Sequence, residues 1–212
     1  MSDRPRKERE FGVPIAGEIL DSARWTQTAL KRLPAKGPLD WTVIFGRQSP
    51  VVVDIGCGSL GLLGLAPHLN VTGVDLHDRP EYPGRLVQAD ATERLPFADD
   101  EFDLAYANSV IEHIEPERRQ AFASEIRRVA RGWWVQTPAM SFPIEPHSLL
   151  PGAHWLPMLL RRPYWKLGAG SNVDEIRLLP RRELEALFGR AFRERLGPFT
   201  KSWISFRDPN GR

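Results

Sequence analysis

Residues 51–75, VVVDIGCGSLGLLGLAPHLNVTGVD, determine the fold that the rest of the sequence completes. The stretch begins with three valines, a short apolar run typical of a strand buried on both faces of a parallel sheet. A glycine turn follows, then a leucine-rich segment that we expect to form a short helix, and a second apolar strand that ends at Asp75. Strand, glycine turn, helix, strand and acidic residue make up half of a nucleoside-binding α/β fold.

Two cofactor classes compete for the turn, because Gly56, Gly58 and Gly61 also fit the G-x-G-x-x-G pattern of dinucleotide-binding proteins. Asp54 discriminates between them. A dinucleotide would place its pyrophosphate on the turn, where a carboxylate opposes the phosphate charge. S-adenosylmethionine has no phosphate and carries an ammonium and a sulfonium there, which a carboxylate favours. Asp75 suits either ligand, because both present a ribose diol.

Four segments in order resemble the class I S-adenosylmethionine-dependent methyltransferases, specifically the type-11 small-molecule group. They are residues 54–59 (DIGCGS), 71–76 (VTGVDL), 86–114, and 137–151 (TPAMSFPIEPHSLLP), and the resemblance covers residues 45–207. The family often has a third glycine where this chain has Leu60, so Gly61 would have to compensate with a different turn.

The resemblance implies a Rossmann-like, doubly wound α/β sheet of seven strands, mostly parallel with an antiparallel last strand and with helices on both faces. It also implies S-adenosyl-L-methionine as the cofactor. The residues that it assigns to cofactor binding are Asp54, Gly56, Cys57, Gly58, Asp75, Leu76, Asp90, Ala91 and Asn108. Asp90 would accept a hydrogen bond from the adenine amino group, although it can also cap the turn that follows it.

The remaining pattern is consistent with that architecture. Strands are expected at residues 85–88, 102–106, 133–136, 192–196 and 202–206. A helix is expected from Pro116 to Gly132 with an apolar stripe, and another from Pro180 to Gly189. We expect residues 1–45 to form a tail and a helical lid segment, residues 46–207 the methyltransferase domain, and residues 137–172 a Pro/Trp/Arg-rich lid insertion.

Two readings of residues 155–166 in that insertion remain open. Apolar residues alternate there with Arg161, Arg162 and Lys166, a combination that suits a membrane interface or a lipid with an anionic head group. The alternative is a helix packed on the sheet with solvated arginines.

His147 and His113 are the candidate catalytic residues, because both follow strands whose ends face the cofactor and a histidine can take a proton from a hydroxyl acceptor. Each also has a structural alternative: His147 could order the lid, and His113 could fix the start of a helix. Cys57 is interpreted as a small packed residue. No metal site is expected, since Glu112 and His113 are adjacent in the sequence.

Composition narrows the function further. Basic and acidic residues nearly balance at 29 and 27, which does not favour nucleic acid as a partner. The single cysteine excludes an internal disulfide, and no run of about 18 apolar residues predicts a membrane span. We expect a cytoplasmic protein, with peripheral contact at the inner membrane surface as an option.

The leading function is methyl transfer to a small-molecule acceptor, a sugar or lipid-linked metabolite. A non-catalytic partner or regulatory protein that binds S-adenosylmethionine is the alternative; a nucleic-acid methyltransferase and a dehydrogenase rank lower.

Overall fold

The computed structural model describes residues 50–64, 66–168 and 173–209. The chain divides into two units, Met1–Asp40 and Trp41–Arg212, and every described residue belongs to the second. The predicted tail and helical lid segment, residues 1–45, lies outside the described residues. The predicted methyltransferase domain is therefore described from residue 50 onwards.

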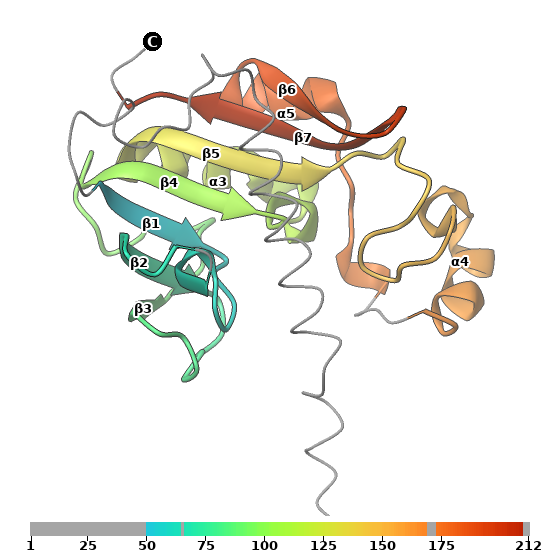
Figure 1. Ribbon diagram of the computed structural model, residues 1–212, viewed down its shortest axis with the longest axis horizontal. Coiled ribbons are helices and arrows are strands. Elements are labelled where there is room, and N and C mark those ends of the chain that lie inside the picture. The colour runs from blue at the N-terminus through green and yellow to red at the C-terminus, as the bar shows by residue number, and fades with distance from the viewer. Residues whose placement is uncertain (1–49, 65, 169–172, 210–212) are drawn as a thin grey trace, which may run out of the picture. The chain divides into compact units, whose positions relative to one another are not determined.

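Seven strands form one sheet in the order β3-β2-β1-β4-β5-β7-β6 (Figure 1). The strands are β1 Val51–Ile55, β2 Asn70–Asp75, β3 Arg85–Gln88, β4 Phe102–Asn108, β5 Ala130–Pro138, β6 Ala191–Leu196 and β7 Phe199–Arg207. Neighbouring strands from β3 to β5 pair in parallel, whereas β7 is antiparallel to both β5 and β6. This topology confirms the predicted Rossmann-like α/β fold with an antiparallel last strand.

The core lies between the sheet and two helices, α3 Arg119–Val129 and α5 Arg181–Phe188. Alternate residues of a strand share one face, so Ile55 of β1, Ala107 of β4 and Val135 of β5 point into the same core. The predicted stripe on α3 is buried against them, and Phe122 is fully buried. Truncation of such a phenylalanine to alanine typically costs about 3–5 kcal/mol.

The expected short helix after β1 was wrong. Among the described residues this segment forms only one 3-10 turn, η2 Leu62–Gly64. Gly61 has a positive φ of 49°, and Gly64 and Pro67 follow closely. Glycine and proline are the two residues that least favour a helix interior, so the leucines cannot extend the turn.

The predicted end, at Gly132, of the helix expected to begin at Pro116 was also wrong. Helix α3 ends at Val129, and the extended Ala130 leads directly into β5. Gly132 lies within that strand, where an added Cβ would come within 2.6 Å of the carbonyl oxygen of Arg207. This glycine therefore permits close packing of the backbone.

A second, small core forms after β5 from the predicted lid insertion together with the residues that directly follow it. After β5 the chain forms η5 Ala153–Trp155, helix α4 Met158–Trp165 and η6 Val173–Glu175. Ala153, Trp165, Val173 and Ile176 make up this core. Two further 3-10 turns, η3 Ile111–His113 and η4 Pro116–Arg118, connect β4 to α3. None of the helices in the described ranges is both long and apolar enough to span a bilayer.

Candidate active site

A cavity of about 530 Å³ opens where β1, β2 and β4 end. In parallel α/β sheets, ligands bind beyond the carboxyl ends of the strands, and this volume is in the range of small-molecule sites. Six predicted site residues line the cavity: Gly56, Asp75, Leu76, Asp90, Ala91 and His113.

Asp75 lies at the end of β2 with its carboxylate at the wall of the cavity. One oxygen accepts a hydrogen bond from the N–H of Gly58 and the other from the N–H of His77, both at 2.9 Å. Arg79 pairs with the same carboxylate at 3.1 Å. These contacts hold the carboxylate in a fixed orientation, as a ribose diol would require.

The glycine turn lies against the neighbouring loop with little space to spare. Gly56 has a φ of 67°, and an added Cβ would come within 2.5 Å of Val110 Cγ2. An added Cβ on Gly61 would lie 2.2 Å from Asp54 Oδ2. Gly61 thus permits the backbone to fold over Asp54. Gly56 lines the cavity, so a side chain at this position would also narrow the cavity.

Asp54 lies beneath the turn and not at the cavity wall. Its carboxylate is buried and accepts a hydrogen bond from the N–H of Leu62 at 2.6 Å. Burial raises the pKa of Asp54 to about 7; the Leu62 N–H opposes this rise, and the charge of Asp75 adds to it. A cation bound nearby would offset both the burial and the repulsion.

Asp90 caps the turn that follows it and also lies at the cavity wall. Its carboxylate accepts hydrogen bonds from the N–H and hydroxyl of Thr92 at 2.9 and 2.6 Å, and it also lines the cavity. Burial alone would raise the pKa of Asp90, but the Thr92 contacts and the Arg118 guanidinium hold it below its ordinary value. Asp90 is therefore a charged acceptor at the cavity wall.

Three other predicted cofactor residues do not line this cavity. Cys57 is buried under the turn, and burial raises the pKa of its thiol to about 12, so it is no nucleophile at neutral pH. Gly58 acts through its N–H bond to Asp75. Asn108 ends β4, but the next residue, Ser109, is the one that faces the cavity.

Ser109 has a φ of 57°, a left-handed conformation that residues other than glycine seldom adopt. Its hydroxyl donates to Gln136 Oε1 at 3.0 Å, which ties the end of β4 to β5. Such strain is frequent at functional sites. The sequence predicted that the end of this strand, Asn108 and Ser109, lies beside the reacting methyl group, but nothing in the residue type of Ser109 indicated the strain.

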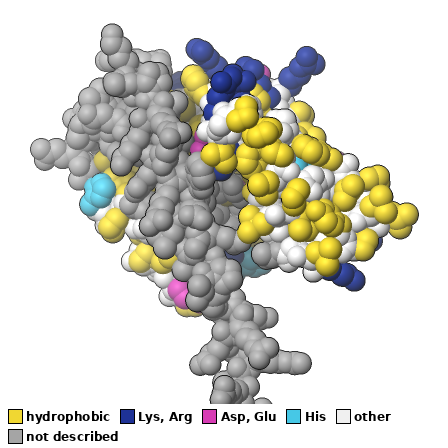
Figure 2. Space-filling model, turned by 45° about the vertical axis from the view of Figure 1, so that its right-hand side comes forward, with side chains coloured by type: hydrophobic (Ala, Val, Ile, Leu, Met, Phe, Trp, Pro, Cys, Tyr) yellow, Lys and Arg dark blue, Asp and Glu magenta, His cyan; other side chains and the backbone are white. Residues whose placement is uncertain are grey.

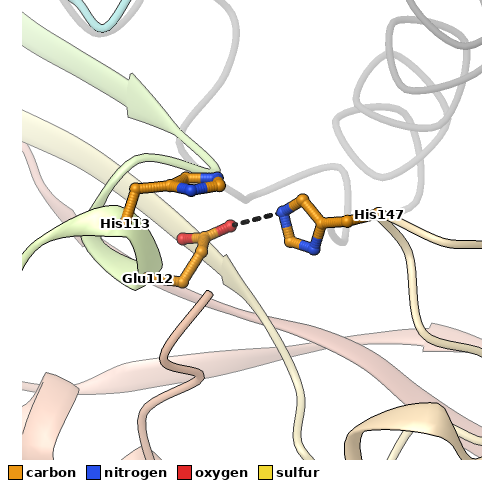
Figure 3. A group of neighbouring side chains, drawn as sticks. All are labelled: Glu112, His113 and His147. Atoms are coloured by element: carbon orange, nitrogen blue, oxygen red, sulfur yellow. Dashed lines mark ion pairs between the residues drawn. The ribbon is translucent and has the colours of Figure 1, made fainter. Parts of the chain in front are cut away.

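Glu112, His113 and His147 converge beside the cavity, as Figure 3 shows. Glu112 and His113 come from η3, and His147 comes from the loop after β5. The two imidazole rings meet edge to face with centroids 5.0 Å apart. His147 Nε2 lies 3.9 Å from Glu112 Oε1. The two predicted catalytic histidines are thus neighbours.

Glu145 orients His147 and is a residue that the sequence analysis missed. Its carboxylate lies 2.7 Å from His147 Nδ1 and accepts hydrogen bonds from the backbone N–H groups of His147 and Ser148. Burial alone would raise the pKa of Glu145, but the His147 and Ser148 contacts lower it. A carboxylate on one ring nitrogen directs the other nitrogen, Nε2, toward Glu112.

Burial is the largest influence on the pKa values of the Glu112 and His113 side chains. Glu112 is fully buried, which raises its pKa, although His147 and the Thr137 hydroxyl counteract the rise. His113 is open to solvent on one side, yet partial burial of the ring and the neighbouring His147 lower its pKa. At neutral pH the His113 ring is therefore a neutral imidazole.

The argument from sequence spacing against a metal site was wrong in its premise. Although Glu112 and His113 are adjacent, one ligand atom from each and one from His147 all lie within 4.8 Å of one another. The tight 3-10 turn and the returning loop bring them together.

Comparisons with known proteins agree with this geometry. Residues 53–132 match the family described as methyltransferase domain. No curated protein matches the chain. The fold is similar to that of 1,6-didemethyltoxoflavin-N1-methyltransferase of Burkholderia thailandensis, with 17% identity and a TM-score of 0.53 over 97% of this chain and 92% of that chain.

A second structure, magnesium protoporphyrin IX methyltransferase from Synechocystis PCC 6803, is similar at 14% identity, with a TM-score of 0.54 over 97% of this chain and 89% of that chain. At such identities these likenesses concern the fold. Over residues 53–132 the chain matches a methyltransferase domain of the type-11 group, and the seven-stranded sheet with a cavity at its carboxyl edge agrees with the Rossmann-like fold of such domains.

Proposed function

We propose that the protein transfers the methyl group of S-adenosylmethionine to a hydroxyl of a small molecule, either a sugar or a lipid-linked metabolite. The observation that carries this proposal is the placement of the histidine pair. His113 lines the cavity that Asp75 and Asp90 also line, and the ring of His147 packs against the ring of His113. The two carboxylates that we assign to the nucleoside and one of the two candidate catalytic histidines thus line the same cavity.

The cofactor residues have separate tasks in this proposal. Asp75 binds the ribose diol and Asp90 the adenine amino group. Gly56 leaves room for the ligand, and Asp54, from beneath the turn, balances the positive methionine end. When bound, S-adenosylmethionine supplies an electrophilic methyl group, whose bonding electron pair remains on the sulfur as the acceptor oxygen takes the carbon.

The acceptor side consists of Glu112, His113 and His147. Glu145 holds the His147 ring through Nδ1, so that its Nε2 faces the cluster. The cluster lowers the cost of losing the hydroxyl proton, and the position of its side chains aligns the acceptor for in-line attack.

Exposed apolar side chains on the lid insertion favour a lipid-linked acceptor over a free sugar. Leu159 is 85% exposed and Leu167 76% exposed, and Trp155, Met158 and Leu160 are exposed as well. Figure 2 shows hydrophobic side chains gathered on the side of the molecule where Figure 1 places α4. Exposed apolar residues of this kind often contact a membrane or another apolar partner.

Calorimetric titration with S-adenosylhomocysteine, run in parallel with NADH, tests the cofactor assignment. We expect binding of the first and none of the second. Binding of NADH alone would contradict the proposal. If S-adenosylhomocysteine binds but no hydroxyl acceptor from the sugar and lipid-linked classes takes a labelled methyl group, the non-catalytic alternative is favoured.

A further inference from the structure

The cluster at the acceptor side contains two fully buried carboxylates, Glu112 and Glu145. Neither forms an ion pair with a lysine or arginine among the described residues; the ion-pair partner of both carboxylates there is His147. A buried carboxylate is stable only when a cation or several donors compensate it. Glu145 has donors at both oxygens, whereas Glu112 is less well provided.

Glu112 has one oxygen without a hydrogen-bond donor. Thr137 donates to Oε2 at 3.1 Å, but Oε1 has no hydrogen-bond partner in the described part of the chain. Figure 3 shows this carboxylate directed at the two imidazole rings. A buried carboxylate oxygen without a donor is unfavourable, and a bound cation would compensate it.

We propose that Glu112, His113 and His147 bind a divalent first-row transition-metal ion, such as Zn²⁺, beside the cofactor cavity. Two imidazoles and one carboxylate with open coordination positions are a common ligand set for such ions. The use of the ion rests on the proposed function: an open position takes the acceptor oxygen and favours loss of its proton to solvent. The two histidines then act as ligands, not as free bases.

The surrounding contacts resemble those of a built metal site. A metal-binding histidine usually donates its other ring N–H to a carboxylate, and Glu145 lies 2.7 Å from His147 Nδ1. The Thr137 hydroxyl likewise fixes the Glu112 carboxylate through Oε2. Both partners leave the inward-facing atoms, His147 Nε2 and Glu112 Oε1, directed at the shared space.

The distances require only side-chain movement. The three candidate ligand atoms lie within 4.8 Å of one another. Bonds of about 2.0–2.2 Å to Zn²⁺ place tetrahedral ligands roughly 3.3 Å apart, so the atoms have to approach by at most about 1.5 Å. Small rotations of the His113 and His147 side chains are enough for this.

The test uses the full chain after any purification tag has been removed. A chelator then removes bound metal from the protein. Titration with ZnCl₂ should give one ion per chain. His147→Ala should weaken Zn²⁺ binding more than 100-fold, and Glu145→Gln by about 10–100-fold, because it removes only the orienting contact. His68→Ala, which removes an exposed histidine outside the cluster, is the matched control and should bind Zn²⁺ as the wild type does.

A second measurement needs no substitution and stays informative if a variant fails to fold. In the Co²⁺-loaded wild-type protein, two histidine ring N–H signals should show large paramagnetic shifts in the NMR spectrum. Fewer than two such signals, or equal Zn²⁺ affinity in wild type and folded His147→Ala, overturns the metal site.

Titration of the same samples with S-adenosylhomocysteine separates the two proposals. If the chain binds S-adenosylhomocysteine but does not bind Zn²⁺, the metal inference is contradicted. A direct proton-accepting role for the histidines then remains. Binding of Zn²⁺ without S-adenosylhomocysteine supports the metal site and contradicts the methyltransferase.

Discussion

Replacement of Asp54 by asparagine should change how the stability of this protein depends on pH. Burial raises the pKa of Asp54 from 3.8 to about 7 in the folded state. Between these values the folded protein holds a proton that the unfolded chain releases. This carboxyl therefore makes folding less favourable as pH rises from about 4, and its cost is complete above about 7.

The magnitude follows from the two pKa values. A difference of about three pH units corresponds to roughly 4 kcal/mol at full ionisation. Roughly 2 kcal/mol of this cost is already present at pH 5, so about 2–3 kcal/mol should appear between pH 5 and pH 8. Asparagine keeps an oxygen that can accept the Leu62 N–H bond but carries no charge.

Chemical denaturation of both proteins at pH 5, 6, 7 and 8 measures the effect. The free energy of unfolding of Asp54→Asn, relative to wild type, should increase by about 2–3 kcal/mol over this range. Asp78→Asn, which removes an exposed carboxylate from the loop after β2, should show no comparable trend. A constant difference between Asp54→Asn and wild type would refute a raised pKa at Asp54.

Three further outcomes are expected. Asp75→Ala should weaken S-adenosylhomocysteine binding by about 10–100-fold in calorimetry, the effect of losing a charged hydrogen bond, and unchanged affinity would exclude Asp75 as the ribose ligand. Gly56→Ala should lower the melting temperature more than Gly197→Ala, because both have a positive φ but only Gly56 would collide with a neighbour; equal losses would contradict the close contact. The wild-type protein should co-sediment with anionic vesicles at low salt, and Leu159→Glu should abolish this, whereas Phe199→Glu on β7 should not; no sedimentation of the wild type removes the membrane contact.

The strands were predictable from sequence because short β-branched and apolar runs lie between turn residues. Residues 51–53, 71–74 and 133–136 all lie in the strands expected for them. The single 3-10 turn after β1 was not predicted, because the prediction gave more weight to the leucine pattern than to Gly61, Gly64 and Pro67. These three residues limit the segment to one turn. Gly132 shows a related difficulty: glycine ends many helices, but here it permits a close backbone contact.

The candidate site was predictable only in part. Asp75 and Asp90 follow strands at recognisable positions, so their place at the cavity could be inferred from the order of the motifs. The approach of His147 to Glu112 could not, because it depends on how the loop after β5 folds back over η3. Sequence spacing carries no information about such a contact.

The separate small core after β5 has a consequence for how this protein could change. Ala153, Trp165, Val173 and Ile176 pack with one another and not within the main cluster under the sheet. Substitutions in two cores without shared contacts usually have additive effects on stability. Substitutions in the small core should therefore change the stability of the protein independently of substitutions in the main core under the sheet.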